Sequence, residues 1–239
     1  MVAAAISHEV FDVTGPGDGR AAKRIRRCAR DNGAVTELVW YAAYGSNMHS
    51  ARLRCYLAGG TPEGGAITLP GCRDSTAPRA TVARTLPGAV YFATESLTWT
   101  GGRAFYDPDG AGETPVRAYL ITAEQFADLV AQEMYRPPGH DLDLTEALAT
   151  GRQSLGPGRY ETLVHAGTLD THPLLTCTAP RHYTSLPGNP PSPAYLRHLA
   201  AGLVESHHWS LPHVARYLAT RPGAESRWTP ETVAAVLES

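Results

Sequence analysis

Apolar and polar positions follow two different periods as the chain leaves residue 37. Residues 37–44, ELVWYAAY, are rich in aromatic and β-branched side chains, a composition typical of a strand. Met48, Ala51, Arg52 and Tyr56 then recur, with Cys55 beside them, at the spacing of one helical face. The pattern predicts a strand that passes through a Gly-Ser-Asn turn directly into a helix.

Short apolar runs follow, and glycine and proline punctuate them. Residues 89–94, 103–106 and 116–121 have the composition of strands, and residues 160–168 and 174–178 resume the pattern later. Runs of this kind favour a small curved or barrel-like sheet over alternating strand–helix units.

Helix starts are marked by capping residues. In residues 122–134, Thr122 is the predicted N-cap and Gln125 completes a capping box three residues later. Ser192-Pro193 provides an N-cap and a first-turn proline for a later helix. Two more helices are predicted after residue 210.

The chain is expected to consist of three parts. Residues 1–36 contain a linker-like Gly/Pro stretch and a short basic run, and we expect an N-terminal extension there. Residues 37–209 hold the predicted sheet, and residues 210–239 form a C-terminal helical extension. Within the central part, the Pro- and Gly-rich residues 137–158 indicate an inserted loop or lid with one short helix.

Charge and cysteine content narrow the class of partner. The 239 residues carry 21 cations and 23 anions without blocks of one sign, so neither a nucleic-acid stripe nor a membrane patch is expected. A small-molecule partner fits better. The four cysteines form no C-x-x-C pair and are typical of a reducing compartment. Since neither a signal peptide nor a membrane-spanning stretch is recognisable, we expect a cytoplasmic protein.

One acid on the capped helix breaks the amphipathic pattern. At 100° per residue, Phe126, Leu129 and Val130 form an apolar stripe, and Glu133 lies on the same stripe. A carboxyl group facing the core near a helix C-terminus is expected to have a raised pKa, towards the range of a general base.

Two other interpretations of this acid stay open on spacing alone. The helix can fray before Glu133, or Arg136 can neutralise it from the next turn. Glu124 and Asp128 point away from the stripe and are expected to be ordinary surface carboxylates.

The turn from Tyr44 to Asn47 is the second candidate feature. A strand that turns over glycine into a helix presents free N–H groups and the positive end of a helix dipole to an anion or oxyanion. The alternative is an ordinary corner, in which Gly45 and Asn47 adopt positive φ.

Other catalytic patterns have little support. Among ten histidines, His207 and His208 are adjacent, and no His-x-x-x-His spacing indicates zinc. Ser46 is not in a Gly-x-Ser-x-Gly elbow, and neither a phosphate loop nor a dinucleotide fingerprint is present.

Several short motifs, in their order along the chain, carry a family resemblance. Tyr-Gly-Ser-Asn follows a hydrophobic strand, and Trp-Thr-Gly-Gly (99–102), Gln132-Glu133, Gly-Arg-Tyr (158–160) and a Pro-Ser-Pro-Ala-Tyr helix start (191–195) come after it. From about residue 38 to 204 the chain resembles the γ-glutamylcyclotransferase family.

The resemblance implies an α+β fold, a small mixed β-barrel with flanking helices, and a reaction that needs neither metal nor cofactor. In that family the α-amine of a γ-glutamyl amide attacks its own γ-carbonyl, releasing an amine and 5-oxoproline. Glu133 is then the general base. The residues implied for substrate binding are Tyr44, Gly45, Ser46, Asn47 and Tyr160. A homodimer is compatible with the resemblance.

Residues 137–158 depart from the family pattern, since the connection after the catalytic helix is longer than usual. Because this stretch begins just after Glu133, it can shape the pocket for a particular leaving amine, whose identity the residues do not give. Two alternative functions stay open. One is an amide hydrolase or acyltransferase of secondary metabolism with the same site, and the other is a non-catalytic binder of a glutamate-like ligand.

Overall fold

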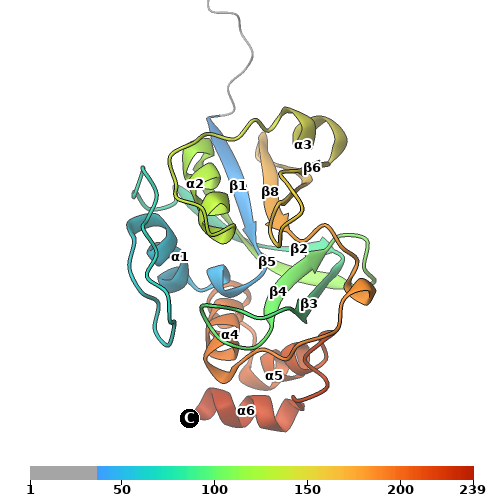
Figure 1. The fold of residues 1–239 in the computed structure, drawn as a ribbon. Coiled ribbons are helices and arrows are strands. Elements are labelled where there is room, and N and C mark those ends of the chain that lie inside the picture. The colour runs from blue at the N-terminus through green and yellow to red at the C-terminus, as the bar shows by residue number, and fades with distance from the viewer. Residues whose placement is uncertain (1–36) are drawn as a thin grey trace, which may run out of the picture. The chain divides into compact units, whose positions relative to one another are not determined.

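A six-stranded mixed sheet organises the part of the chain that the computed structural model describes, residues 37–239 (Figure 1). Its strand order is β2-β5-β1-β8-β7-β6. The central strand β1 (Leu38–Ala43) pairs antiparallel with β5 (Glu113–Thr122) and parallel with β8 (His172–Thr178). The remaining strands of this sheet are β2 (Ala80–Pro87), β6 (Arg152–Ser154) and β7 (Thr162–Leu169).

A separate two-stranded ribbon contributes residues to the candidate functional site described below. It consists of β3 (Ala89–Ala93) and β4 (Arg103–Asp107), paired antiparallel. Both strands are buried along their whole length, because the ribbon packs between the large sheet and the segment that follows β8. Residues 94–102 connect the two strands, so the Trp-Thr-Gly-Gly motif lies at the end of a long loop rather than in a tight hairpin turn.

Helices lie at both ends of the sheet strands (Figure 1). Six α-helices and two short 3-10 helices occur in residues 37–239, and those early in the chain surround β1 while the last three lie together. Their bounds are η1 Ser46–Met48, α1 Ser50–Ala58, α2 Ala123–Glu133, α3 Thr145–Thr150, η2 Tyr183–Ser185, α4 Pro193–His207, α5 Leu211–Ala219 and α6 Pro230–Glu238.

The core forms where α2 packs against β1 and β5 and where α4 packs against η1 and β5. Phe126 on α2 is fully buried, and its ring centroid lies 6.1 Å from that of Tyr41 on β1. On α4, Gly202 permits a close approach to η1, since a Cβ there would lie 2.5 Å from the Cβ of Met48. The turn after β1 is therefore held from two sides.

The α+β class predicted from the sequence is confirmed, and the sheet is open rather than a closed barrel. Its edge strands are β2 and β6. Closure requires hydrogen bonds between the edge strands, but β6 has three residues and neither edge strand is continuously buried. The sheet curves around the core without joining its two ends.

The predicted helix starts are confirmed. Thr122 and Gln125 form the reciprocal capping box of α2, and Ser192 accepts a hydrogen bond from the amide of Tyr195 at the start of α4. The strands β2 and β6 were not predicted, because their residues are polar or exposed and lack an apolar period.

The predicted N-terminal extension, residues 1–36, lies outside the described residues, as does Cys28. The C-terminal extension is helical, and its apolar side chains belong to the same core cluster as those of α4. The stretch 137–158 contains α3 and then β6, which pairs with β7. Across residues 37–239, every helix is too short or too polar to cross a membrane.

Candidate functional site

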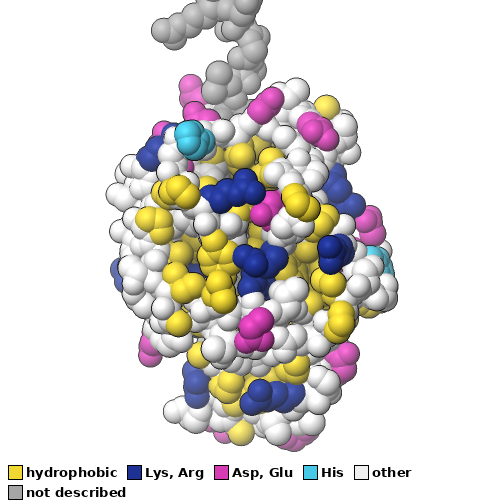
Figure 2. All heavy atoms as spheres, in the orientation of Figure 1, with side chains coloured by type: hydrophobic (Ala, Val, Ile, Leu, Met, Phe, Trp, Pro, Cys, Tyr) yellow, Lys and Arg dark blue, Asp and Glu magenta, His cyan; other side chains and the backbone are white. Residues whose placement is uncertain are grey.

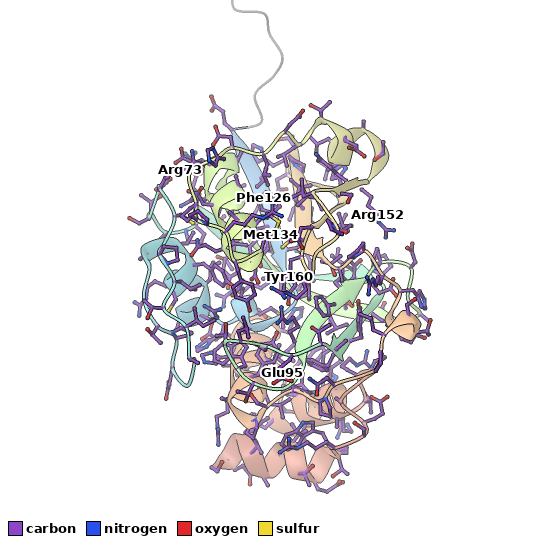
Figure 3. The ribbon with its side chains drawn as sticks, viewed as in Figure 1. Arg73, Glu95, Phe126, Met134, Arg152 and Tyr160 are labelled. Carbon is purple, nitrogen blue, oxygen red and sulfur yellow. The ribbon has the colours of Figure 1, made fainter. Side chains whose placement is uncertain are left out.

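A cavity opens beside the end of β1, between α1, the C-terminal end of α2, the 94–102 loop and the segment before β7. All six residues predicted for the site line it, namely Tyr44, Gly45, Ser46, Asn47, Glu133 and Tyr160. The empty space, counted with its opening to solvent, is about 660 Å³. Figure 3 labels Tyr160 and also Met134, the residue after Glu133.

The turn after β1 lines this cavity without a left-handed backbone. Gly45 has φ −106°, and Asn47 is not among the residues with positive φ. The alternative of an ordinary corner, in which both residues adopt positive φ, is therefore wrong. Residues 46–48 form the 3-10 helix η1, and α1 starts only at Ser50. The turn therefore does not lead directly into a long helix, and the predicted helix-dipole contribution is not available at residues 45–47.

What the turn does provide is free amide groups. The first N–H groups of a helix have no intrahelical acceptor. Among the described residues no backbone oxygen accepts from the amides of Gly45, Ser46 or Asn47, and no side chain caps η1. Gly45 also allows a close contact, because a Cβ at this position would lie 3.3 Å from the hydroxyl of Tyr195.

Asn47 connects the turn directly to the predicted base. Its Nδ2 donates to Oε1 of Glu133 at 3.1 Å and to the hydroxyl of Tyr41 at 3.1 Å. Asn47 is buried, and its Oδ1 has no protein donor among the described residues. The two features that the sequence analysis identified separately are therefore in contact.

Glu133 is the last residue of α2, so the helix has not frayed before it. Burial raises the pKa of its carboxyl group, while hydrogen bonds from Tyr56 and Asn47 and the charges of Arg52 and Arg103 act in the opposite direction. Arg136 does not neutralise it, since Arg136 pairs instead with Glu161 at 3.5 Å.

Backbone contacts fix two tyrosines of the cavity wall, Tyr44 and Tyr160. The Tyr44 hydroxyl donates to the carbonyl oxygen of Cys177 at 2.8 Å, and that of Tyr160 donates to the carbonyl oxygen of Ala104 at 2.8 Å. Burial raises the pKa of both tyrosines well above its usual value. Their hydroxyl oxygens can still accept a hydrogen bond, and their rings form part of the cavity wall.

Asp128 was expected at the surface, and this prediction is wrong. Its side chain is fully buried on α2 and accepts from the Arg73 amide at 2.8 Å, from Arg73 Nε at 3.0 Å and from the Gly139 amide at 3.0 Å. The helical period gave the direction of Asp128 correctly but not the segments that cover it. Arg73 and Gly139 thus anchor the helix that carries Glu133.

Sequence reasoning also missed two arginines in the cavity wall. Arg52 and Arg103 line the cavity and are only 3% and 4% exposed. The sequence pattern could have indicated Arg52, because it shares the helical spacing of Met48 and Tyr56, which face the core. No pattern marked Arg103, which follows two glycines at the start of β4.

The part of the chain that the structure describes contains no cluster of side chains typical of a metal site. Across residues 37–239, His, Cys, Asp and Glu side chains do not gather in groups of three or more that could hold an ion. Cys55, Cys72 and Cys177 are free thiols.

Comparison with known proteins gives one relative in sequence and several in structure. No protein-family model matches the chain. Histone deacetylase 5 of Arabidopsis thaliana is 32% identical over 198 residues, which cover 75% of this chain. The chain spans only 30% of that protein's length, so most of the relative lies outside the match.

Among solved structures, an uncharacterized human protein is similar with a TM-score of 0.47 and 16% identity, over 85% of this chain and 99% of that one. A second structure has a TM-score of 0.46 and 15% identity, over 84% and 99% of the two chains. That second protein is a gamma-glutamyl cyclotransferase. YkqA of Bacillus subtilis is similar with a TM-score of 0.40 and 15% identity, over 77% of this chain and 55% of its own.

Proposed function

We propose that this protein is an enzyme of the γ-glutamyl cyclotransferase type. In the reaction, the α-amine of a γ-glutamyl amide attacks the γ-carbonyl carbon of the same molecule, the amide C–N bond breaks, and the products are 5-oxoproline and a free amine. The observation that carries the proposal is the 3.1 Å hydrogen bond between Asn47 and Glu133 at one cavity. It joins a half-buried acid to a turn with free amides.

Glu133 moves the proton in this mechanism. As a carboxylate it accepts a proton from the attacking nitrogen, and as a carboxylic acid it returns that proton to the leaving nitrogen. A raised pKa suits both steps, because the group must change its protonation state near neutral pH. The hydrogen bonds from Tyr56 and Asn47 keep the carboxylate form accessible.

In this mechanism the turn supplies the hydrogen-bond donors for the γ-carbonyl oxygen. Free amides of Gly45, Ser46 and Asn47 can stabilise the oxyanion that forms on the γ-carbonyl oxygen, and the rings of Tyr44 and Tyr160 orient the glutamyl chain. Closure of a five-membered ring is intramolecular, so orientation and one proton transfer account for most of the catalysis required.

The test is the substitution Glu133→Gln, which keeps the shape and the acceptor oxygen but cannot carry the proton. We expect release of 5-oxoproline from γ-glutamyl amides, measured by mass spectrometry, to fall by about 10²–10⁴-fold. The matched control is Glu124→Gln on the same helix, whose side chain is 43% exposed and should be silent. Full turnover by the Glu133 variant contradicts the mechanism.

The product distinguishes the alternative functions. Release of open-chain glutamate instead of 5-oxoproline identifies an amide hydrolase with the same site. Tight binding of a γ-glutamyl compound that is recovered unchanged identifies a non-catalytic binder. The printed name of the Arabidopsis relative applies to a protein more than three times as long as the matched region, so deacetylation is not proposed for this chain.

A further inference from the structure

Two hydrogen bonds within the turn after β1 fix the peptide groups that carry its free amides. The amide of Met48 donates to the carbonyl oxygen of Gly45 at 3.0 Å, and the amide of His49 donates to that of Ser46 at 3.0 Å. A carbonyl oxygen and the N–H of the following residue belong to one planar peptide group. The planes that contain the free amides of Ser46 and Asn47 are therefore set by these two donors.

Two side chains of β5 hold those donors from the opposite side. The Tyr119 hydroxyl lies 3.0 Å from the carbonyl oxygen of Asn47 and 3.0 Å from that of Met48. Nη1 of Arg117 also donates to the carbonyl oxygen of Met48 at 3.0 Å, so each carbonyl can have a donor of its own. Because these carbonyls share peptide planes with the amides of Met48 and His49, the two β5 side chains fix both donors of the turn.

The strand pairing explains why these side chains reach the turn. Tyr119 pairs with Tyr41, and Arg117 pairs with Ala43, the last residue of β1. Residues two apart in a strand point to the same face of the sheet, and the guanidinium carbon of Arg117 lies 5.1 Å from the ring centroid of Tyr119. Burial raises the pKa of Tyr119, so its hydroxyl group stays protonated and can donate.

A carboxylate on α4 holds Arg117 in this position. Oε2 of Glu205 accepts from Nη1 of Arg117 at 2.7 Å and from the amide of Ser50 at 3.1 Å. Burial acts to raise the pKa of Glu205, but the Ser50 amide and Arg117 lower it below its usual value. The same helix also approaches the turn directly, because a Cβ at Gly202 would lie 2.8 Å from the amide nitrogen of His49.

These side chains act on the cavity only through the turn. Tyr119, Arg117 and Glu205 are not among the residues that line it. Donors that are fixed before the reaction stabilise a developing charge without reorganisation at the transition state.

We infer that Tyr119 and Arg117 are positioning residues, which hold the turn so that the amides of Ser46 and Asn47 are preorganised for the oxyanion. The inference rests on the proposed function, because that function gives the turn its role in oxyanion binding. Glu205 supports the same arrangement by holding Arg117.

The first test is Tyr119→Phe, which removes one hydroxyl group and keeps the buried ring. Because the oxyanion forms only on the way through the transition state, looser donors should lower kcat for 5-oxoproline release by about 10–100-fold and leave KM within about twofold. The matched control is Tyr91→Phe, which removes a hydrogen bond from another buried tyrosine to the carbonyl oxygen of Arg181. This control should leave kcat unchanged.

Arg117→Met should lower kcat in the same way, and Arg117→Lys should recover part of the loss because it keeps a charged donor. Glu205→Gln should lower kcat by only about 2–5-fold, the range of a partly exposed ion pair, since the Glu205 side chain is 35% exposed. The control for charge is the exposed Arg84→Met on β2. Figure 2 shows charged side chains of both signs spread over the face that it draws, so loss of one surface charge should leave the turnover unchanged.

Two kinetic results overturn the inference. One is a raised KM with unchanged kcat in both Tyr119→Phe and Arg117→Met. The other is equal activity of Tyr119→Phe and Tyr91→Phe.

Amide hydrogen exchange, followed residue by residue by NMR, tests the positioning without the reaction. Tyr119→Phe should speed exchange at Met48 and His49 by about 10-fold or more relative to the β1 amides, and Tyr91→Phe should not. If the wild type releases no 5-oxoproline and exchange still responds in this way, the proposed reaction is wrong and the hold on the turn is supported. Unchanged exchange at both amides in Tyr119→Phe overturns the inference even in an active enzyme.

Discussion

At the scale of single residues, Asn47 connects the turn after β1 to Glu133 through a hydrogen bond. One N–H of its amide group is directed to Tyr41 and the other to Glu133, so the side chain has one orientation. Its Oδ1 is buried and has no hydrogen-bond donor among the described residues. The side chain of Asn47 therefore contacts the carboxyl group of Glu133 and lowers its pKa, against the effect of burial.

The substitution Asn47→Ala should change the pH dependence of the reaction. The hydrogen bond from Asn47 lowers the pKa of Glu133, so its loss raises that pKa further. In the proposed mechanism the carboxylate form of Glu133 is the active base, so the acidic limb of kcat/KM against pH should move to higher pH. Tyr56→Phe removes a second lowering hydrogen bond and should move the limb in the same direction.

A pH profile that keeps its acidic limb in both variants would exclude Glu133 as the titrating base. The exposed Glu146→Gln on α3 serves as the control and should leave the profile unchanged.

At the scale of elements, α2 shows what a sequence can and cannot provide. The capping residues gave its start, and its apolar stripe identified Glu133 as an acid facing inward. The same period placed Asp128 on the solvent side, because periodicity gives the direction of a side chain and not the segments that fold over it. Arg73 and Gly139, which cover Asp128, lie 55 and 11 residues away in sequence.

Asp128→Asn should destabilise the protein by about 2–4 kcal/mol at neutral pH, since it leaves Arg73 and the Gly139 amide without their charged acceptor. Burial alone would raise the pKa of Asp128, but the contacts with Arg73 and Gly139 hold it below its usual value. A lowered pKa adds stability above the unfolded-state pKa, and this stability is lost as the pH falls through the native value.

Urea unfolding at pH 7 and at pH 3 measures the effect. The difference between wild type and Asp128→Asn should shrink at the lower pH. The matched control is the exposed Asp141→Asn, which contacts the same arginine at 2.8 Å and should cost less than about 1 kcal/mol. A loss for Asp128→Asn that is equal at both pH values contradicts the assignment.

At the scale of the molecule, residues 37–239 behave as one core rather than as a domain with an appendage. Val214 and Leu218 on α5 and Val233 on α6 are buried in the same cluster as Leu196 and Leu199 of α4. A boundary near residue 210 was expected because the family resemblance does not extend over the late helices. Which surface they cover depends on contacts that a linear pattern does not contain.

Leu218→Ala on α5 should therefore affect the catalytic part. The side chain is 2% exposed, and the cavity it leaves should cost about 2–5 kcal/mol. Thermal unfolding and loss of activity should occur in one transition at a lower temperature. The exposed Leu211→Ala on the same helix is the control, and a separate early transition that leaves activity intact would contradict a shared core.

The unpartnered guanidinium groups of Arg52 and Arg103 have a consequence for the ligand-free protein itself. In the described residues, Nε and Nη1 of both side chains are buried without a hydrogen-bond acceptor, which is unfavourable for the folded protein. A ligand that completes their hydrogen bonds should raise the midpoint of thermal unfolding, by an amount that grows with its concentration relative to Kd. The melting curve of the protein can therefore report which acidic metabolites fit, before any reaction has been assayed.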